Sequence, residues 1–189
     1  MMTMQVVCAA ALHAQSTQPP KRGTGSGIYP VAERVVLPAR RTVRMAELLV
    51  TAIPVMHSLL APAVGYRISD GRTAVFYVPD VAHIPRLRET LRNIDVYVGD
   101  GATIEHPLLR RQGRLLVGHA SIRQQVAWCQ AARVRQAIFT HCGSAIVAAG
   151  AAAELRVRQL GTAAVHVSVA FDGWRHRIER EGHRARRLH

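Results

Sequence analysis

The stretch from residue 73 to residue 103 decides the fold class, because it contains two β-rich runs, TAVFYVPD at 73–80 and IDVYVGDGAT at 94–103. β-Branched and aromatic residues fill both runs, as is typical of strands. Residues 84–92 between them have a helical pattern. Strands that alternate with helices predict a sheet covered by helices, so we expect an α/β (α+β) protein.

The alternation continues toward the C-terminus. Ser121 is a candidate N-cap for a helix at 121–132, because its hydroxyl can accept a hydrogen bond from the first helical turn. Next come a strand at 136–141, an alanine-rich helix at 145–160 and a strand at 165–173. The Asp172-Gly173 pair at the end of that strand predicts a hairpin turn.

Toward the N-terminus, strands follow one another without helices. We predict strands at 28–37, 48–57 and 63–69, with a turn at Ser69-Asp70-Gly71, and expect this part of the sheet to be antiparallel. Residues 1–14 are expected to form a short helical piece. The predicted organisation is a short N-terminal piece with a Pro- and Gly-rich linker at 1–27, one globular domain at 28–178 and a basic tail at 179–189.

The composition indicates one domain with an excess of positive charge. The chain has 189 residues, of which 49% are apolar, and a formal net charge of +13 with Lys21 as its sole lysine. Such a charge favours anionic partners such as phosphates, nucleic acid or an acidic protein face. The arginines are spread along the chain, so a compositional bias of the source genome is the alternative explanation.

The cysteines and the hydropathy pattern predict a cytoplasmic protein. Three cysteines at unpaired spacings indicate a reducing compartment. No apolar run reaches the roughly 18 to 20 residues that span a bilayer, so no membrane partner is expected. A weak secretory signal ending near Ala14 is the alternative.

Four candidate functional residues follow predicted strands or precede a predicted helix: His57, Asp80, His119 and His141. Side chains at strand ends lie on loops that a rigid sheet holds in place. Histidine and carboxylate together are ligands that zinc prefers. As a set, these residues predict a metal site.

Four segments resemble metallo-β-lactamase-fold hydrolases of the ribonuclease Z and cyclic phosphodiesterase kind. They are HSLLAPAVGYRI at 57–68, FYVPDV at 76–81, DVYVGDGAT at 95–103 and GHASIRQQVAWCQAARVRQAIFTHCG at 118–143. The resemblance runs from about residue 28 to residue 178 and is carried by order and spacing. It implies a four-layer αβ/βα sandwich.

The resemblance also implies a site for two zinc ions, with manganese as the alternative metal. His57 would bind one ion, Asp80 would bridge both ions, and His141 would bind the second. His119 would lie beside the scissile bond as a proton donor or anion contact, so that Asp80 and His119 are the catalytic residues. Two such ions generate hydroxide and clamp the attacked group.

Two features depart from this family. Its principal signature, His-x-His-x-Asp-His, is absent from the 189 residues, so the resemblance predicts an N-terminally truncated sandwich with an uncovered sheet surface that favours self-association. The chain alone is therefore expected to bind metal poorly, and a segment with the signature to restore binding. Ribonuclease Z relatives have an acidic residue directly before Ala-Thr. In this chain Gly101 separates Asp100 from Ala102-Thr103, and this difference argues against tRNA processing.

The sequence therefore predicts a metal-dependent hydrolase of phosphodiester-type substrates, with RNA and a small cyclic phosphate as the anionic substrates considered. One alternative is a non-catalytic relative that binds anions or nucleic acid through its arginines. Another is a subunit whose site is completed by a second polypeptide.

Cys142, beside His141, could be a thiolate ligand or nucleophile, but a small buried residue after a strand is the simpler interpretation. His13 stands alone, and we interpret His83, His106 and His166 as structural.

Overall fold

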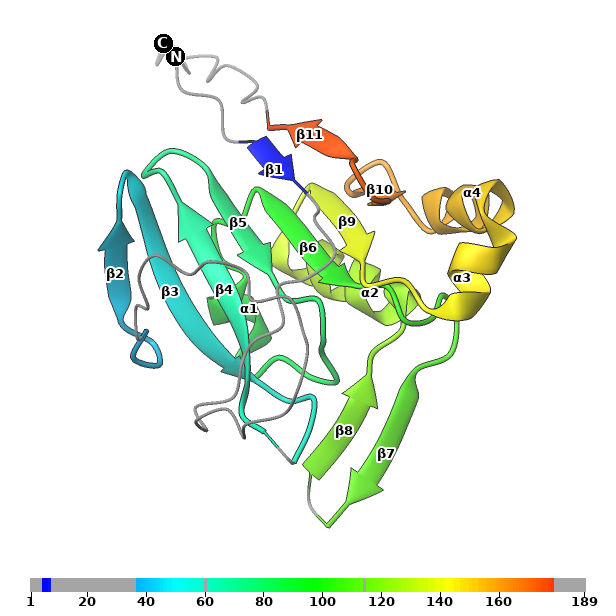
Figure 1. Ribbon diagram of the computed structural model, residues 1–189, viewed down its shortest axis with the longest axis horizontal. Coiled ribbons are helices and arrows are strands. Elements are labelled where there is room, and N and C mark those ends of the chain that lie inside the picture. The colour runs from blue at the N-terminus through cyan, green and yellow to red at the C-terminus, as the bar shows by residue number, and fades with distance from the viewer. Residues whose placement is uncertain (1–4, 8–36, 60, 114, 179–189) are drawn as a thin grey trace, which may run out of the picture.

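A seven-stranded sheet is the largest element of the computed structural model, which describes residues 5–7, 37–59, 61–113 and 115–178 (Figure 1). The strand order is β10-β9-β6-β5-β4-β3-β2. The strands are β2 (Thr42–Met45), β3 (Leu48–Val55), β4 (Ala63–Ser69), β5 (Ala74–Tyr77), β6 (Val96–Asp100), β9 (Gln136–Thr140) and β10 (His166–Val169). The strands predicted within 48–103 and at 136–141 and 165–173 are confirmed.

The strand directions determine which loops meet. Strands β2 to β5 pair antiparallel, whereas β5, β6, β9 and β10 pair parallel. Because β4 is antiparallel to both of its neighbours, β3 runs in the same direction as β5, β6 and β9. The carboxyl ends of these four strands therefore lie at one edge of the sheet, where α/β proteins place their functional loops.

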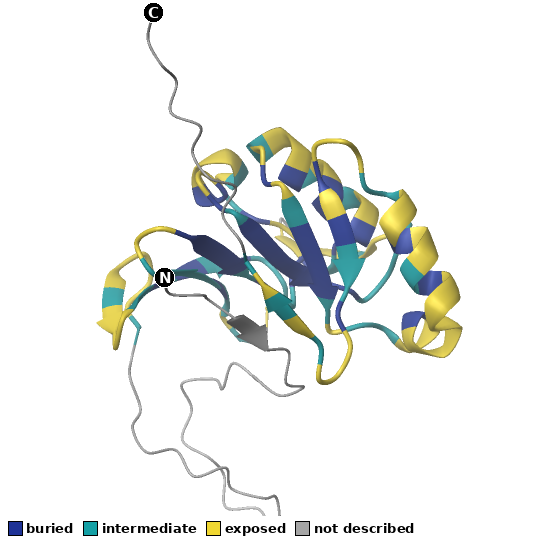
Figure 2. Ribbon diagram, turned by 90° about the horizontal axis from the view of Figure 1, so that it is seen from above, coloured by how far each residue is buried: buried dark blue, intermediate teal, exposed yellow. Residues whose placement is uncertain are grey.

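Helices cover one face of the sheet (Figure 2). They are α1 (Leu87–Thr90), α2 (Ile122–Ala132), α3 (Ser144–Ala149) and α4 (Ala151–Gln159). Phe76, Tyr97 and Phe139 face these helices and are fully buried. Their strand neighbours point to the opposite face, where Val98 and Ile138 pack near Trp174. The parallel strands β5, β6 and β9 are thus buried on both faces, as is usual for parallel strands, whereas most residues of β2 are exposed.

Two further strand pairs lie outside the large sheet. Strand β7 (Leu108–Gln112) and strand β8 (Leu115–His119) form a hairpin that projects from the body of the molecule (Figure 1). Strand β1 (Gln5–Val7) pairs antiparallel with β11 (Arg175–Arg177). The sequence patterns had indicated neither pair.

Four expectations concern the two ends of the chain, where much of the sequence lies outside the described residues. The helical piece expected within 1–14 is wrong at 5–7, which form β1. The strand predicted at 28–37 lies outside the described residues except for Leu37, which is not in a strand. The segment 16–27 and the tail 179–189 also lie outside them.

Three other predicted elements are corrected. The helix expected at 145–160 is divided into α3 and α4 by Gly150, whose φ of +50° belongs to the left-handed region that glycine adopts freely. The helix expected near 84–92 is limited to 87–90. Asp172-Gly173 does form a turn, but it is not a hairpin turn, because β10 and β11 belong to different sheets.

The helix at 121–132 and the turn at 69–71 are confirmed. The hydroxyl of Ser121 accepts a hydrogen bond from the amide of Gln124 at 3.2 Å and caps α2. Asp70 closes the β4–β5 turn by accepting hydrogen bonds from the amides of Arg72 and Thr73. None of the described helices is both long and apolar enough to span a membrane.

Candidate metal centre

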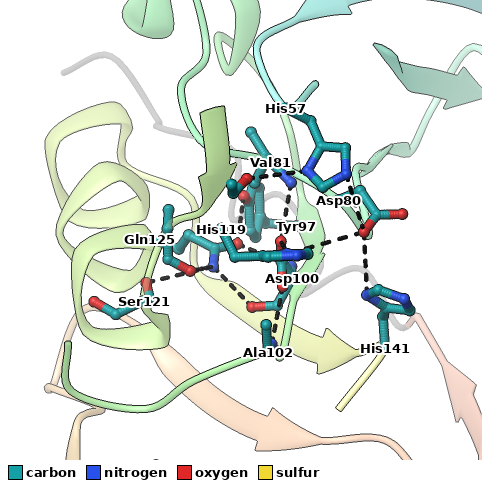
Figure 3. A network of polar contacts seen from close by, with 12 residues as sticks. His57, Asp80, Val81, Tyr97, Asp100, Ala102, His119, Ser121, Gln125 and His141 are labelled. Atoms are coloured by element: carbon teal, nitrogen blue, oxygen red, sulfur yellow. Dashed lines mark hydrogen bonds and ion pairs between the residues drawn. The ribbon is translucent and has the colours of Figure 1, made fainter. Parts of the chain in front are cut away.

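Four of the polar residues at the candidate centre follow strands at the same sheet edge (Figure 3). His57 lies after β3, Asp80 after β5 and His141 after β9, and Asp100 is the last residue of β6. These strands run in one direction, so their ends present the four side chains side by side. His119, the fifth residue, comes from the end of β8.

Asp80 is the common neighbour of the three histidines. Its Oδ1 atom lies 3.9 Å from Nε2 of His57, 3.9 Å from Nδ1 of His119 and 3.2 Å from Nδ1 of His141. The carboxylate is 41% exposed, so a solute can reach it. The structure therefore brings the four candidate residues together around one carboxylate oxygen.

The orientation of His57 is determined by the hairpin. Its Nδ1 lies 3.0 Å from the carbonyl oxygen of Gly118, and since a carbonyl only accepts, Nδ1 must donate. Nε2, which faces Asp80, then carries the free lone pair. A backbone carbonyl that fixes the tautomer in this way is the usual partner of a metal-binding histidine.

His141 has an unusual backbone conformation. Its φ of +54° lies in the left-handed region, which residues other than glycine adopt infrequently. This conformation ends β9 at Thr140 and leaves the imidazole beside Asp80. Strained backbone of this kind is found often at functional sites.

His119 forms the shortest of these contacts. Its Nδ1 donates to Oδ2 of Asp100 at 2.7 Å. This hydrogen bond raises the pKa of His119 above its ordinary value of 6.5; partial burial opposes the increase, and the charges of Asp100 and Asp80 add to it. The imidazolium form is thus stabilised, and its Nε2 then carries the second proton.

Asp100 is fully buried, and the sequence interpretation had not placed it in the site. Its carboxylate accepts hydrogen bonds from the amides of Val81 at 3.0 Å and Ala102 at 2.9 Å in addition to His119. Three donors compensate for the lost hydration of a buried charge. Asp100 lies at the end of a predicted strand, as Asp80 does. This position could have indicated from the sequence that Asp100 belongs to the site.

A second buried polar residue, Gln125 of α2, supports Asp100. Its Oε1 accepts from the amide of Asp100 and from the hydroxyl of Tyr97, both at 2.9 Å. Its Nε2 donates to the carbonyl oxygens of Asp100 and Ala120. Burial raises the pKa of Tyr97 well above its ordinary value, so the phenol stays protonated and donates.

Two groups of described residues could hold a metal ion, each with donor atoms within 4.8 Å of one another. The first group is His57, Asp80 and His119, and the second is Asp100, His119 and His141. The mixture of imidazole and carboxylate suits a zinc ion. The predicted ligand set of His57, Asp80 and His141 meets at Asp80, but neither group contains all three.

The remaining candidates lie apart from these groups. His83, His106 and His166 belong to neither group, and His13 lies outside the described residues. Cys142 lines a cavity of about 510 Å³ together with His119 and His141, but it belongs to neither group.

The sequence matches the model of the beta-lactamase superfamily domain over residues 2–142. Because this match covers well over half of the 189 residues, the chain belongs to that family. The family resemblance and the mixed α/β fold class inferred from the sequence are thereby confirmed. A comparison with curated protein sequences gave no significant match.

Solved structures with a similar fold include a diphosphatase of the PhnP family, the metallo-β-lactamase-fold protein YhfI from Bacillus subtilis and zinc-bound PqqB from Methylobacterium extorquens. Their TM-scores are 0.55, 0.57 and 0.52, at 19%, 14% and 18% sequence identity. The matches cover 77%, 76% and 74% of this chain, and 48%, 55% and 54% of the other chains. The chain thus spans about half the length of these proteins, and the likeness concerns the fold.

Proposed function

We propose that the protein is a metal-dependent hydrolase that acts on phosphodiesters. The observation that carries this proposal is the position of Asp80, whose Oδ1 lies within 3.9 Å of a nitrogen of His57, His119 and His141. These residues come from the ends of separate strands. They are distant in the sequence, and only the fold brings them together. The PhnP-family neighbour is a diphosphatase, which supports a phosphate substrate.

His57, Asp80 and His141 would hold the metal, and zinc is the proposed ion because the donors suit it and the PqqB neighbour binds it. A divalent ion bound there supplies a Lewis acid that polarises a phosphoryl oxygen. The half-buried His57 and Asp80 remain reachable from solvent, as binding of a substrate requires.

His119 would donate a proton to the leaving group. Its raised pKa keeps a larger fraction of the imidazolium near neutral pH than an unperturbed histidine would have. Asp100 acts through His119 as a positioning residue, because it holds Nδ1 and leaves Nε2 as the donating atom.

The exposed arginines of β2 and the β7–β8 hairpin support a second candidate, a non-catalytic module that binds anions. A third candidate is a subunit completed by another polypeptide. Under the proposed assignment, each of two ions would have one histidine and share Asp80. Binding by the chain alone is therefore expected to be weak, and metal has to be supplied in excess.

Hydrolysis of bis(p-nitrophenyl) phosphate with excess zinc or manganese tests the proposal. We expect slow turnover by the unmodified chain and a loss of at least about 100-fold in His119→Asn, which is the scale of one acid-base group. Asp80→Asn should lose at least as much, because it removes the carboxylate that all three histidines face. His83→Asn is the matched control, because His83 is an exposed histidine outside both groups, and it should retain full turnover.

Elemental analysis after dialysis separates the candidates. We expect less than one tightly held ion per chain, and an increase in both metal content and turnover when a segment with His-x-His-x-Asp-His is added. If the chain alone retains two tightly bound ions, further residues must complete the site. Asp100 and His119 are then the first candidates. No turnover with excess metal and the added segment would contradict the hydrolase and leave the binding module.

A further inference from the structure

A cavity of about 850 Å³ lies beside the candidate metal centre, between the segment 57–59 and the β7–β8 hairpin. His57 and His119 of the candidate metal centre line it, and Leu59, Leu108 and Arg110 are among its other lining residues. The proposed reaction assigns a role only to the two histidines. The other lining residues could therefore bind a part of the substrate other than the attacked phosphate.

The register of the hairpin determines which side chains form this wall. Leu108 pairs with His119, and Arg110 pairs with Val117. Directly paired residues of an antiparallel ladder project to the same face, and neighbours along a strand project to opposite faces. Leu108 and Arg110 therefore share the face of His119, whereas Arg111 and its partner Leu116 belong to the other face.

On the hairpin face that carries His119, apolar side chains lie near the metal centre and a positive charge lies further away. Leu108, beside His119, is 58% exposed, and Leu59 across the cavity is 43% exposed. Arg110 lies two residues further out along the strand, roughly 7 Å from Leu108 between Cα atoms. Moving outward from the metal centre, a ligand would meet an apolar patch first and then a positive charge.

Some arginines of the described chain are paired with acids, whereas Arg110 is not. Arg123 and Arg156 pair with Glu105, and Arg158 pairs with Glu154. No described acidic side chain lies within ion-pair distance of Arg110, although the residue is exposed and lines the cavity. Its charge is therefore available to an anion.

The hairpin is joined to the metal centre at its base. The amide of Gly118 donates to the carbonyl of His57 at 2.8 Å, and the carbonyl of Gly118 accepts from the imidazole of His57. The amide of Ala120 donates to the carbonyl of Val81 at 2.6 Å. These bonds hold the wall at a fixed distance from the metal centre, as a specificity site requires.

We propose that the β7–β8 hairpin is a specificity subsite for phosphodiesters that carry an apolar ring and a second phosphate. The ring lies between Leu59 and Leu108, and Arg110 binds the second phosphate while the attacked phosphate lies beside His119. The inference rests on the proposed hydrolase function and adds the substrate class: a nucleotide-linked phosphodiester with a terminal phosphate.

Two probes that differ only in the second phosphate test the subsite: thymidylyl-(3′→5′)-thymidine and its 5′-phosphorylated form. Affinities are measured by saturation-transfer NMR titration of the full chain in EDTA, at constant ionic strength, so that binding is read without turnover. The phosphorylated probe should bind about tenfold more tightly, the scale of one charge-assisted hydrogen bond to phosphate. Arg110→Ala should remove this preference.

Arg111→Ala is the matched control, since it removes the same charge from the other face of the same strand and should preserve the preference. Leu108→Ala should lower the affinity for both probes a few-fold, and Leu116→Ala should change neither affinity. The proposal is overturned if the wild-type chain shows no preference for the phosphorylated probe, if Arg110→Ala keeps the preference, or if Arg111→Ala removes it equally.

These outcomes are independent of the proposed hydrolase function. Turnover of bis(p-nitrophenyl) phosphate, which has no second phosphate, tests that function. Turnover without an Arg110-dependent preference would reject the subsite alone. An Arg110-dependent preference without turnover would reject the hydrolase and keep an anion-binding groove.

Discussion

Asp100 shows how one buried residue controls an exposed one. The carboxylate of Asp100 is fully buried, and it binds Nδ1 of the partly exposed His119 at 2.7 Å. Because a hydrogen bond to the charged form stabilises that form, the pKa of His119 is the measurable consequence.

Asp100→Asn should lower the pKa of His119 in the metal-free protein, because the variant removes the largest cause of the upward shift. Asp80→Asn should lower this pKa less, since the charge of Asp80 is the smallest of the causes. Titration of the imidazole by NMR measures both values. An equal pKa for His119 in all three proteins would show that the hydrogen bond to Asp100 has no electrostatic effect.

The same pair makes stability depend on pH. The pKa of His119 is raised on folding, so its stabilising contribution is complete below the unfolded value of about 6.5 and is lost as pH rises through the folded value. The loss of unfolding free energy in Asp100→Asn should therefore be larger at pH 5.5 than at pH 9. Urea unfolding of the metal-free proteins at both pH values measures the difference.

Gln125 permits a second test with a built-in control. Gln125→Leu leaves the buried hydroxyl of Tyr97 and the backbone of Asp100 without partners, so we expect a loss of about 3 kcal/mol in unfolding free energy. Gln124 precedes it on α2, and its Oε1 is buried without a partner. Gln124→Leu should therefore cost little. Equal losses in urea unfolding would refute this difference.

At the scale of elements, the β7–β8 hairpin contributes His119 to the candidate centre. It lies between β6 and α2 in the chain and brings His119 to an edge otherwise formed by strand ends. Gly118 makes its close approach possible: its φ is +112°, and a Cβ there would lie 2.0 Å from the carbonyl oxygen of Leu108.

Gly118→Ala should displace β8 from β7 and disturb both His119 and the His57 bond to the Gly118 carbonyl. We expect a loss of about 1 to 3 kcal/mol in stability and a larger relative loss of turnover. Gly113→Ala is the control: this glycine also has a positive φ, of +61°, but no atom lies within 4 Å of a Cβ there. Retention of wild-type turnover in Gly118→Ala would contradict the positioning role.

The sheet itself was largely predictable from local sequence. The runs of β3 to β6 and β9 contain many β-branched and aromatic residues, and α2 has a serine cap. The hairpin was not predictable, because LLRRQ and LLVGH lack a clear alternation and three of their leucines are exposed. The break at Gly150 was missed because alanine favours helix on both sides of it.

At the scale of the molecule, only the folded chain can assemble the metal donors. The residues His57, Asp80 and His141 are far apart in sequence, and the unfolded chain does not hold them together. Zinc should therefore raise the melting temperature, with about 1.4 kcal/mol of stabilisation at a tenfold excess over Kd. Asp80→Asn should abolish this increase and His83→Asn should keep it, as measured by calorimetry. An increase that survives Asp80→Asn would come from other histidines, such as His176.

The sequence by itself determined the class of the sheet, the family resemblance and four of the five residues of the candidate centre, Asp80 included, since strand propensity and strand-end chemistry are local properties. Tertiary structure alone decided that β3 runs with β5, β6 and β9, that Asp100 lies behind His119, and that Arg110 and not Arg111 lines the cavity. Strand order, register and burial arise from contacts between residues distant in the chain, and no single segment contains that information.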